Sequence, residues 1–150
     1  FANKIWNIAR FVLENKGEIT YEKEFKNYSE RDTELVKERH DMIMDITKDM
    51  EEYRLYMAAE KLYHYTWHTF ADTIIEESKG ILKSGTAEEK VSRQQFLLHT
   101  LDTVLKCLHP FMPFVTEEIW QRWNETEHAT WNMEQAKENM LMIQEWPVKM

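Results

Sequence analysis

The segment from Leu108 to Trp120 limits the fold more than any other part of the chain, because it holds two prolines three residues apart. Proline lacks a backbone donor and disfavours helix in the residue before it, so the preceding helix must end near His109. Thr116 is then a suitable N-cap for a new helix, with Glu117 and Glu118 where the helix dipole favours negative charge. The elbow should be packed, because it carries much apolar bulk: Phe111, Met112, Phe114, Ile119 and Trp120.

Composition favours one globular domain built from long helices. Of the 150 residues, 43% are hydrophobic and 31% charged, and only three glycines and three prolines occur. These proportions suit a helical globular domain better than a turn-rich β design. No apolar run is long enough to span a membrane, and no signal-peptide pattern is present. We therefore expect a cytoplasmic protein, and the start at Phe1 indicates a piece of a longer chain.

The net charge limits which nucleic acids the chain could bind. Nineteen Lys and Arg against 27 Asp and Glu give a formal charge of −8. Affinity for duplex phosphates rests on clustered Lys and Arg, so generic duplex binding, and DNA as a partner, are not expected. A protein that reads a few unstacked RNA bases through shape, stacking and hydrogen bonds needs less positive charge.

Hydrophobic periodicity divides the chain into helices. Thr86 and Glu89 form a capping-box pattern at the start of the fourth helix, and Gly80 and Gly85 should flank the connection before it. The expected helices span residues 3–14, 33–50, 52 or 54 to 78, 86–109, and 116 to at least 123. The prediction is an all-α fold, an antiparallel helical bundle of about five helices.

The same pattern predicts the core and the connections. Core candidates on the second and third helices are Leu35, Met42, Ile43, Ile46, Met50, Met57, Ala58, Leu62, Tyr65 and Ile75. Cys107, the only cysteine, excludes an internal disulfide and lies in an apolar run, where an inert buried thiol is expected. Residues 16–32 should form a lightly packed linker or weak helix. Residues 1–150 then make one domain, in which 124–150 are a polar connection and a C-terminal docking segment, extended over 141–147.

One pattern on the third helix could bind a metal. His64, His68 and Asp72 stand four residues apart on one helix face, a spacing that could present ligands to a divalent ion. The simpler interpretation is a partly wet helix face, and no His-Glu-x-x-His or CxxC motif supports a metal. Glycine-rich phosphate loops and serine elbows are absent, so we expect no catalytic site and no metal.

The first helix carries a polar stripe made of Asn3, Lys4, Asn7 and Arg10, with Phe11 beside it. Amide side chains can pair with a base edge, Arg can bond bidentately or stack on a base, and Lys can bind phosphate. The simpler alternative is the ordinary solvent face of an amphipathic helix. The stripe is therefore a candidate RNA-binding site that the residues alone do not decide.

Several blocks, in order, resemble the helical anticodon-binding domain of class I aminoacyl-tRNA synthetases. The chain opens with NKIWNIARF at residues 3–11, carries LHPFMPFVTEEIW at the elbow, and matches over 56–72 and 142–147. The first helix and the elbow are most similar to the valyl enzymes. The sequence departs from the family at RDTEL (31–35), where Asp-Arg-Trp-Ile is usual, and at Thr73-Ile74, where an aromatic pair is usual.

The resemblance implies a role in holding the anticodon stem-loop of tRNA(Val). The whole enzyme would join valine to that tRNA, using ATP with magnesium at a catalytic domain of the same polypeptide. These 150 residues should bind no cofactor and perform no reaction themselves. Carried over from the matching motif, Arg10 is the expected base contact, Asn3, Asn7 and Phe11 lie near it, and Lys4 is the phosphate partner.

Other interpretations stay open at this point. Isoleucyl, leucyl and methionyl enzymes share the helical domain. A free-standing helical protein-interaction module would also account for the acidic surface and the many aromatic residues. Binding of a valine-type anticodon stem-loop separates these alternatives.

Overall fold

The computed structural model describes residues 1–128 and 131–147, and within these ranges it contains helices and no strand. The elements are α1 (Ala2–Glu14), α2 (Glu30–Glu51), α3 (Leu55–His64), the π-helical η1 (Tyr65–Ile75), α4 (Glu76–Ser84), α5 (Ala87–Leu108), α6 (Pro113–Glu127), α7 (Met133–Glu138) and the 3-10 turn η2 (Leu141–Ile143). The predicted all-α helical bundle is confirmed. Among the described helices, none combines the length and the apolar content that a membrane span requires.

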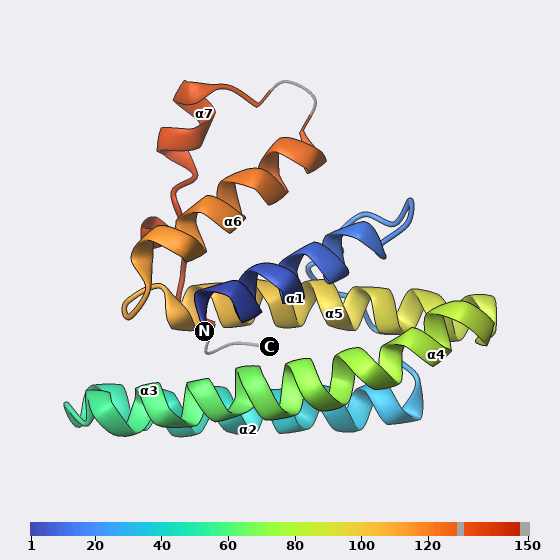
Figure 1. Ribbon diagram of the computed structural model, residues 1–150, viewed down its shortest axis with the longest axis horizontal. Helices are drawn as coiled ribbons and strands as arrows, with labels where there is room; N and C mark the ends of the chain where they lie inside the picture. Colours follow the sequence, from blue (N-terminus) through green and yellow to red (C-terminus); the bar gives the residue numbers. More distant parts are fainter. Residues whose placement is uncertain (129–130, 148–150) are drawn as a thin grey trace.

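The helices form two long antiparallel pairs with a smaller unit on one side (Figure 1). α3, η1 and α4 continue one another as a single rod, which lies against α2 and runs in the opposite direction. α1 lies along α5, also in the opposite direction, and contacts both η1 and α6. α1 is therefore held from three sides, which fixes the direction of its outward face.

α5 is the central helix of the core. Leu98, Leu101 and Leu105 have no exposed surface, and they belong to a cluster that also includes Phe70 of η1. Cys107 belongs to the same cluster, and its burial raises the pKa of the thiol to about 12. The expected burial of this cysteine is confirmed, and its raised pKa favours the protonated thiol, which is a poor nucleophile.

The start of α5 confirms the predicted capping box. The Thr86 hydroxyl accepts from the backbone N–H of Glu89, and the Glu89 carboxylate accepts from the backbone N–H of Thr86, both at 3.2 Å. Ser29 caps α2 in a similar way, because its hydroxyl accepts from the backbone N–H of Asp32 at 3.1 Å. Each cap pairs backbone donors that the helix itself leaves free.

A buried ion network fixes α2 against α4 and α5. Arg93 of α5 has no exposed surface, and its Nε donates to Asp32 of α2 at 2.7 Å. The same guanidinium donates to Ser78 at 2.9 Å and to Glu77 at 3.1 Å, both on α4. Ser92 donates to the second oxygen of Asp32 at 2.6 Å. The network therefore holds the first turn of α2 against α4 and α5.

The elbow differs from its prediction in where α6 begins. The helix starts at Pro113 rather than after Thr116, because the first helical position needs no backbone donor and suits the fixed φ of proline. Thr116 lies inside the first turns and donates to the Met112 carbonyl at 2.7 Å. Ile119 is buried, and Phe111, Met112 and Trp120 pack against the core, but Phe114 is 89% exposed.

Other differences concern the third predicted helix and the C-terminal segment. The rod runs through Gly80 to Ser84, so the connection is shorter than predicted, and Met57 is 38% exposed rather than buried. Residues 141–143 form a 3-10 turn, so the segment is not extended from its start as predicted. Leu141 is buried, and the Trp146 indole donates to Thr47 of α2 at 2.8 Å. Parts of the predicted 124–150 segment, at 129–130 and 148–150, lie outside the described residues.

Candidate nucleic-acid interface

The polar stripe of α1 lies on the molecular surface. The apolar face of the helix is buried in the core through Ile5, Ile8, Ala9 and Val12. Asn3, Asn7 and Arg10 are exposed on the opposite side. The helix thus presents two amides and a guanidinium outward from a rigid, buried support.

Arg10 keeps most of its hydrogen-bonding capacity. Its Nη2 donates to Oδ1 of Asn7 at 3.2 Å, and this is its one hydrogen-bond partner among residues 1–128 and 131–147. A guanidinium carries five N–H donors, so the others are left for an external acceptor. The bond to Asn7 also orients the guanidinium along the helix edge.

Lys4 is held in place by η1. Its ammonium donates to Oδ1 of Asp72 at 3.0 Å and lies 4.7 Å from the centre of the Trp67 ring. The Lys4 and Asp72 side chains are 30% and 49% exposed, so solvent reaches the pair. Lys4 is thereby directed to the same side of the molecule as the aromatic ring.

Phe11 differs from the other predicted residues, because it is partly buried and packs against the core cluster. Its carbonyl accepts from the backbone N–H of Asn15 at 3.1 Å and from the Asn15 side chain at 2.8 Å, which ends α1. The residue therefore combines a structural role with a half-buried ring at the end of the stripe.

The side chains of the His64, His68 and Asp72 pattern, which could have suggested a metal site, contact other groups in the structure. Asp72 accepts from Lys4, and its other oxygen lies 3.6 Å from Nδ1 of His68. The rings of His64 and His68 lie against each other, with centroids 5.0 Å apart. In the described part of the chain no group of three or more such side chains is arranged to hold a metal ion.

Aromatic side chains flank the stripe on both sides, and the sequence pattern did not predict this. Phe1 meets Tyr63 and Trp67 on the side of η1. On the side of α6, the Arg122 guanidinium lies 5.0 Å from the centre of the Trp6 ring. The four-residue spacing of Tyr63 and Trp67 marks a shared helix face, but the contact with Phe1 depends on the tertiary fold.

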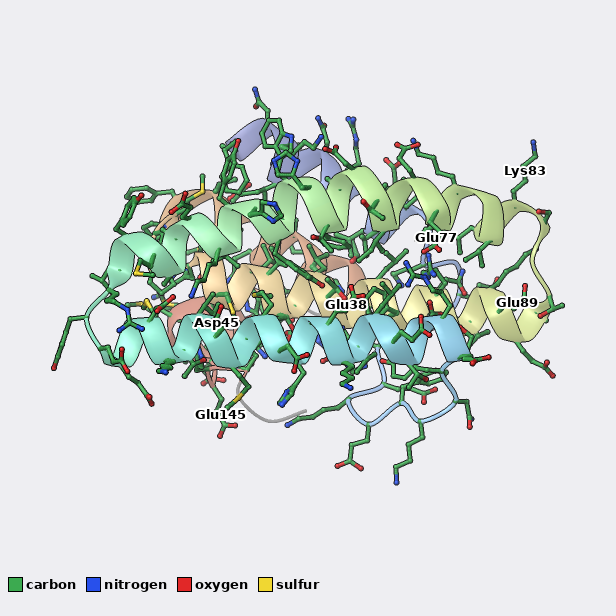
Figure 2. The ribbon with its side chains drawn as sticks, turned by 90° about the horizontal axis from the view of Figure 1, so that it is seen from below. Glu38, Asp45, Glu77, Lys83, Glu89 and Glu145 are labelled. Carbon is green, nitrogen blue, oxygen red and sulfur yellow. The ribbon has the colours of Figure 1, made fainter. Side chains whose placement is uncertain are left out.

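The face formed by α2 and α4 has a different character. Figure 2 views the molecule from below, where Glu38 and Asp45 project from α2, Glu77 and Lys83 from α4 and Glu89 from α5. Asp45 is paired with Lys61, and Glu77 with Arg31 and Arg93. Carboxylates repel nucleic-acid phosphates. Repulsion is therefore expected along α2, which carries eight acidic and four basic side chains, but not along α4, where Glu76 and Glu77 are matched by Lys79 and Lys83.

Known proteins similar to this chain agree on one family. The family model described as the anticodon-binding domain of tRNA ligase matches residues 32–150. A valine–tRNA ligase from Petrotoga mobilis is 41% identical over 125 residues, covering 81% of this chain and 14% of that protein. One from Legionella pneumophila (strain Lens) is 39% identical over 126 residues, covering 81% and 14%.

A valine–tRNA ligase from Buchnera aphidicola extends the match to the first helix. It is 32% identical over 153 aligned residues, which cover 98% of this chain. The alignment takes in only 15% of that protein. The chain thus spans about one seventh of the length of these curated relatives.

Proposed function

The chain belongs to the family of anticodon-binding domains of tRNA ligases, and we propose that it binds the anticodon loop of tRNA(Val) within a longer valine–tRNA ligase. The observation that carries the proposal is the exposed Asn3–Asn7–Arg10 edge on a helix whose other face is buried. The choice of valine in this proposal rests on the names of the matched relatives, which are valine–tRNA ligases.

The exposed edge has the chemistry that loop recognition requires. Bases of an RNA loop can be splayed out, hydrogen-bonded on their edges and stacked on guanidinium or aromatic planes. Arg10 offers donors to a base, and Asn3 and Asn7 offer amides that both donate and accept. Lys4 offers its ammonium to a phosphate, and the half-buried ring of Phe11 borders the same surface.

The negative net charge of the chain is more compatible with a small contact to a few RNA nucleotides than with broad binding along a duplex. The chain carries −8, so it lacks the excess of basic residues that broad duplex binding needs. Recognition of a few loop nucleotides depends more on stacking and base-edge hydrogen bonds. The excess of carboxylates on α2 then disfavours RNA on that side of the molecule.

The reaction itself is assigned to the rest of the polypeptide. A catalytic domain outside these residues would join valine to tRNA with ATP and magnesium, in the cytoplasm. The role of this chain is to grip the anticodon end, so that the acceptor end reaches the distant active site. It needs no cofactor of its own for that role.

Substitution of Arg10 tests the proposal in the full-length ligase. A good base contact contributes on the order of 1–3 kcal/mol, so Arg10→Ala should lower kcat/KM for tRNA by about ten- to a hundredfold. Valine activation, followed by ATP–pyrophosphate exchange, should not change, because it requires no tRNA. Lys83→Ala, on α4, serves as the matched control. Unchanged aminoacylation kinetics would remove Arg10 from the site.

Direct binding separates anticodon recognition from a general protein-interaction module. The chain should bind a stem-loop that carries a valine anticodon more tightly than one whose middle adenine is replaced. Equal affinity for the two loops would contradict base recognition. Failure to bind either loop would favour the interaction module.

A further inference from the structure

Three aromatic side chains lie together beside α1. They are Phe1, which precedes that helix, Tyr63 of α3 and Trp67 of η1. The ring of Phe1 lies 4.8 Å from that of Tyr63 and 6.1 Å from that of Trp67, centre to centre. Tyr63 and Trp67 are 5.6 Å apart with an interplanar angle of 27°, so their planes are nearly parallel. We call these three residues the ring cluster.

The ring cluster is open to solvent. Tyr63 is 43% exposed, and Phe1 and Trp67 are half-buried. Neighbouring rings also hold one another in place, so little further order is lost when a flat ligand stacks on them. The cluster is therefore a preformed surface for a planar group.

A cation stands at the edge of the ring cluster. The Lys4 ammonium lies 4.7 Å from the Trp67 ring centre, and Asp72 holds it there through a 3.0 Å hydrogen bond. A nucleotide that stacks on the rings would place its phosphate within reach of such a cation. Aromatic rings combined with Lys or Arg form the common platform for unpaired nucleotides.

Another exposed apolar group provides a contrast. At the turn between α2 and α3, Tyr53 is 90% exposed, Leu55 50% and Tyr56 77%. Within the described residues, no ring–ring or cation–ring contact joins these three. Of the two groups, the ring cluster is the one that combines nearly parallel rings with a positioned cation and adjoins the polar stripe of α1.

We propose that the ring cluster binds an unpaired base of the RNA loop by stacking, with Lys4 contacting the phosphate of that nucleotide. The inference rests on the proposed function and extends its surface from α1 onto α3 and η1. Tyr63 is the most exposed ring of the cluster and the best residue for a test.

The experiment measures binding of a fluorescein-labelled tRNA(Val) anticodon stem-loop to the full chain by anisotropy. Tyr63→Leu removes the ring and should weaken binding about tenfold, within the range known for base stacking. Tyr63→Phe keeps the ring and should bind like the unsubstituted chain. Tyr56→Leu, on the same helix but outside the cluster, should have no effect. Thermal melting of each variant checks that the fold is retained.

A series of stem-loops, each with one abasic nucleotide, identifies the stacked base. For the loop that lacks that base, Tyr63→Leu and the unsubstituted chain should bind equally, because no base is left to stack on the ring. For every other loop the tenfold difference should persist. This dependence on a single base is a result that a general loss of structure would not produce.

Each remaining outcome overturns the inference. Equal affinity of Tyr63→Leu for the intact loop would exclude the ring cluster and leave the Arg10 contact in place. A lower melting temperature without any change in affinity would identify the cluster as a protein-packing surface. If the unsubstituted chain binds no loop at all, the ring cluster and the proposed function fail together.

Discussion

Arg10 and Arg93 have the same side chain but different roles, because one is exposed and the other is buried. Arg93 has no exposed surface and donates to Asp32, Ser78 and Glu77. Arg10 is exposed and, in the described part of the chain, donates to Asn7 alone. Arg93 therefore has its partners within the fold, whereas the donors of Arg10 remain available to another molecule.

The two regions should respond to substitution in opposite ways. Removing one member of a saturated buried network leaves other polar groups without partners and away from water. Removing a side chain from an exposed edge leaves only solvent contacts behind. The buried network should thus determine the free energy of unfolding, and the α1 edge should determine the affinity for RNA.

The largest expected effect is that of Arg93→Ala. This change leaves the Asp32 carboxylate buried without its cation, a situation that typically costs about 3–5 kcal/mol of unfolding free energy. Urea denaturation followed by circular dichroism measures it. In the same assay Arg10→Ala should change the free energy of unfolding by less than about 0.5 kcal/mol. Similar losses in both variants would remove the distinction between the two regions.

A smaller effect on the free energy of unfolding is expected from a change of pH, through a partly buried histidine. His99 of α5 lies partly buried with its Nε2 2.6 Å from the Glu22 carbonyl, and desolvation lowers the pKa of its imidazole. The unfolded chain then binds more protons than the folded one near and below the ordinary pKa of histidine, about 6.5. The free energy of unfolding should therefore fall as the pH drops from 8 through 6.5 and towards 5.

His99→Gln separates this contribution from that of other groups. Glutamine can keep a donor near the Glu22 carbonyl but does not titrate, so the variant should lose less stability between pH 8 and 5 than the unsubstituted chain. Urea midpoints at several pH values measure the difference. Identical pH profiles for the two proteins would exclude His99 as the source.

The smallest expected effect lies on the exposed side, at the pair of Lys4 and Asp72. Ion pairs that solvent reaches contribute about 0–1 kcal/mol, so Asp72→Asn should change the free energy of unfolding by no more than about 0.5 kcal/mol. Urea denaturation at low and high salt is the appropriate measurement. A loss well above 1 kcal/mol would mean that the pair is part of the structural framework.

Local signals in the sequence are enough to predict most of the helices. The capping box at Thr86 and the apolar stripe of α1 each depend on residues within one or two turns, and the structure confirms both. The start of α6 is not predictable in this way, because Pro113 and Thr116 are both good helix starters and the sequence does not rank them. Gly80 has the pattern of a helix breaker, but tertiary contacts outweigh its cost of about 1 kcal/mol in a helix.

The buried ion network escapes prediction for a different reason. Charged residues are usually assigned to the surface, yet Arg93 stands three and four residues before the buried Phe96 and Leu97. Asp32 likewise stands three residues before the buried Leu35. A charged residue that falls on an apolar helix stripe is therefore a signal for a buried pair, although its partner cannot be read from the sequence.

Only part of the candidate site could be predicted from the sequence. The polar stripe and the adjoining Phe11 stand out because they share one helix. The ring cluster does not, since Phe1 lies more than sixty positions before Tyr63 and Trp67 and meets them only in the folded chain. Contacts at that separation require the packing of α1 against η1.

The most direct test of the proposed surface is to map the amide signals of the chain by NMR during titration with the tRNA(Val) anticodon stem-loop. We predict that shifts concentrate on α1 and on the neighbouring part of η1, including Asn7, Arg10 and Trp67. Shifts confined to α2 and α4, or no shifts at saturating RNA, would contradict the proposed surface.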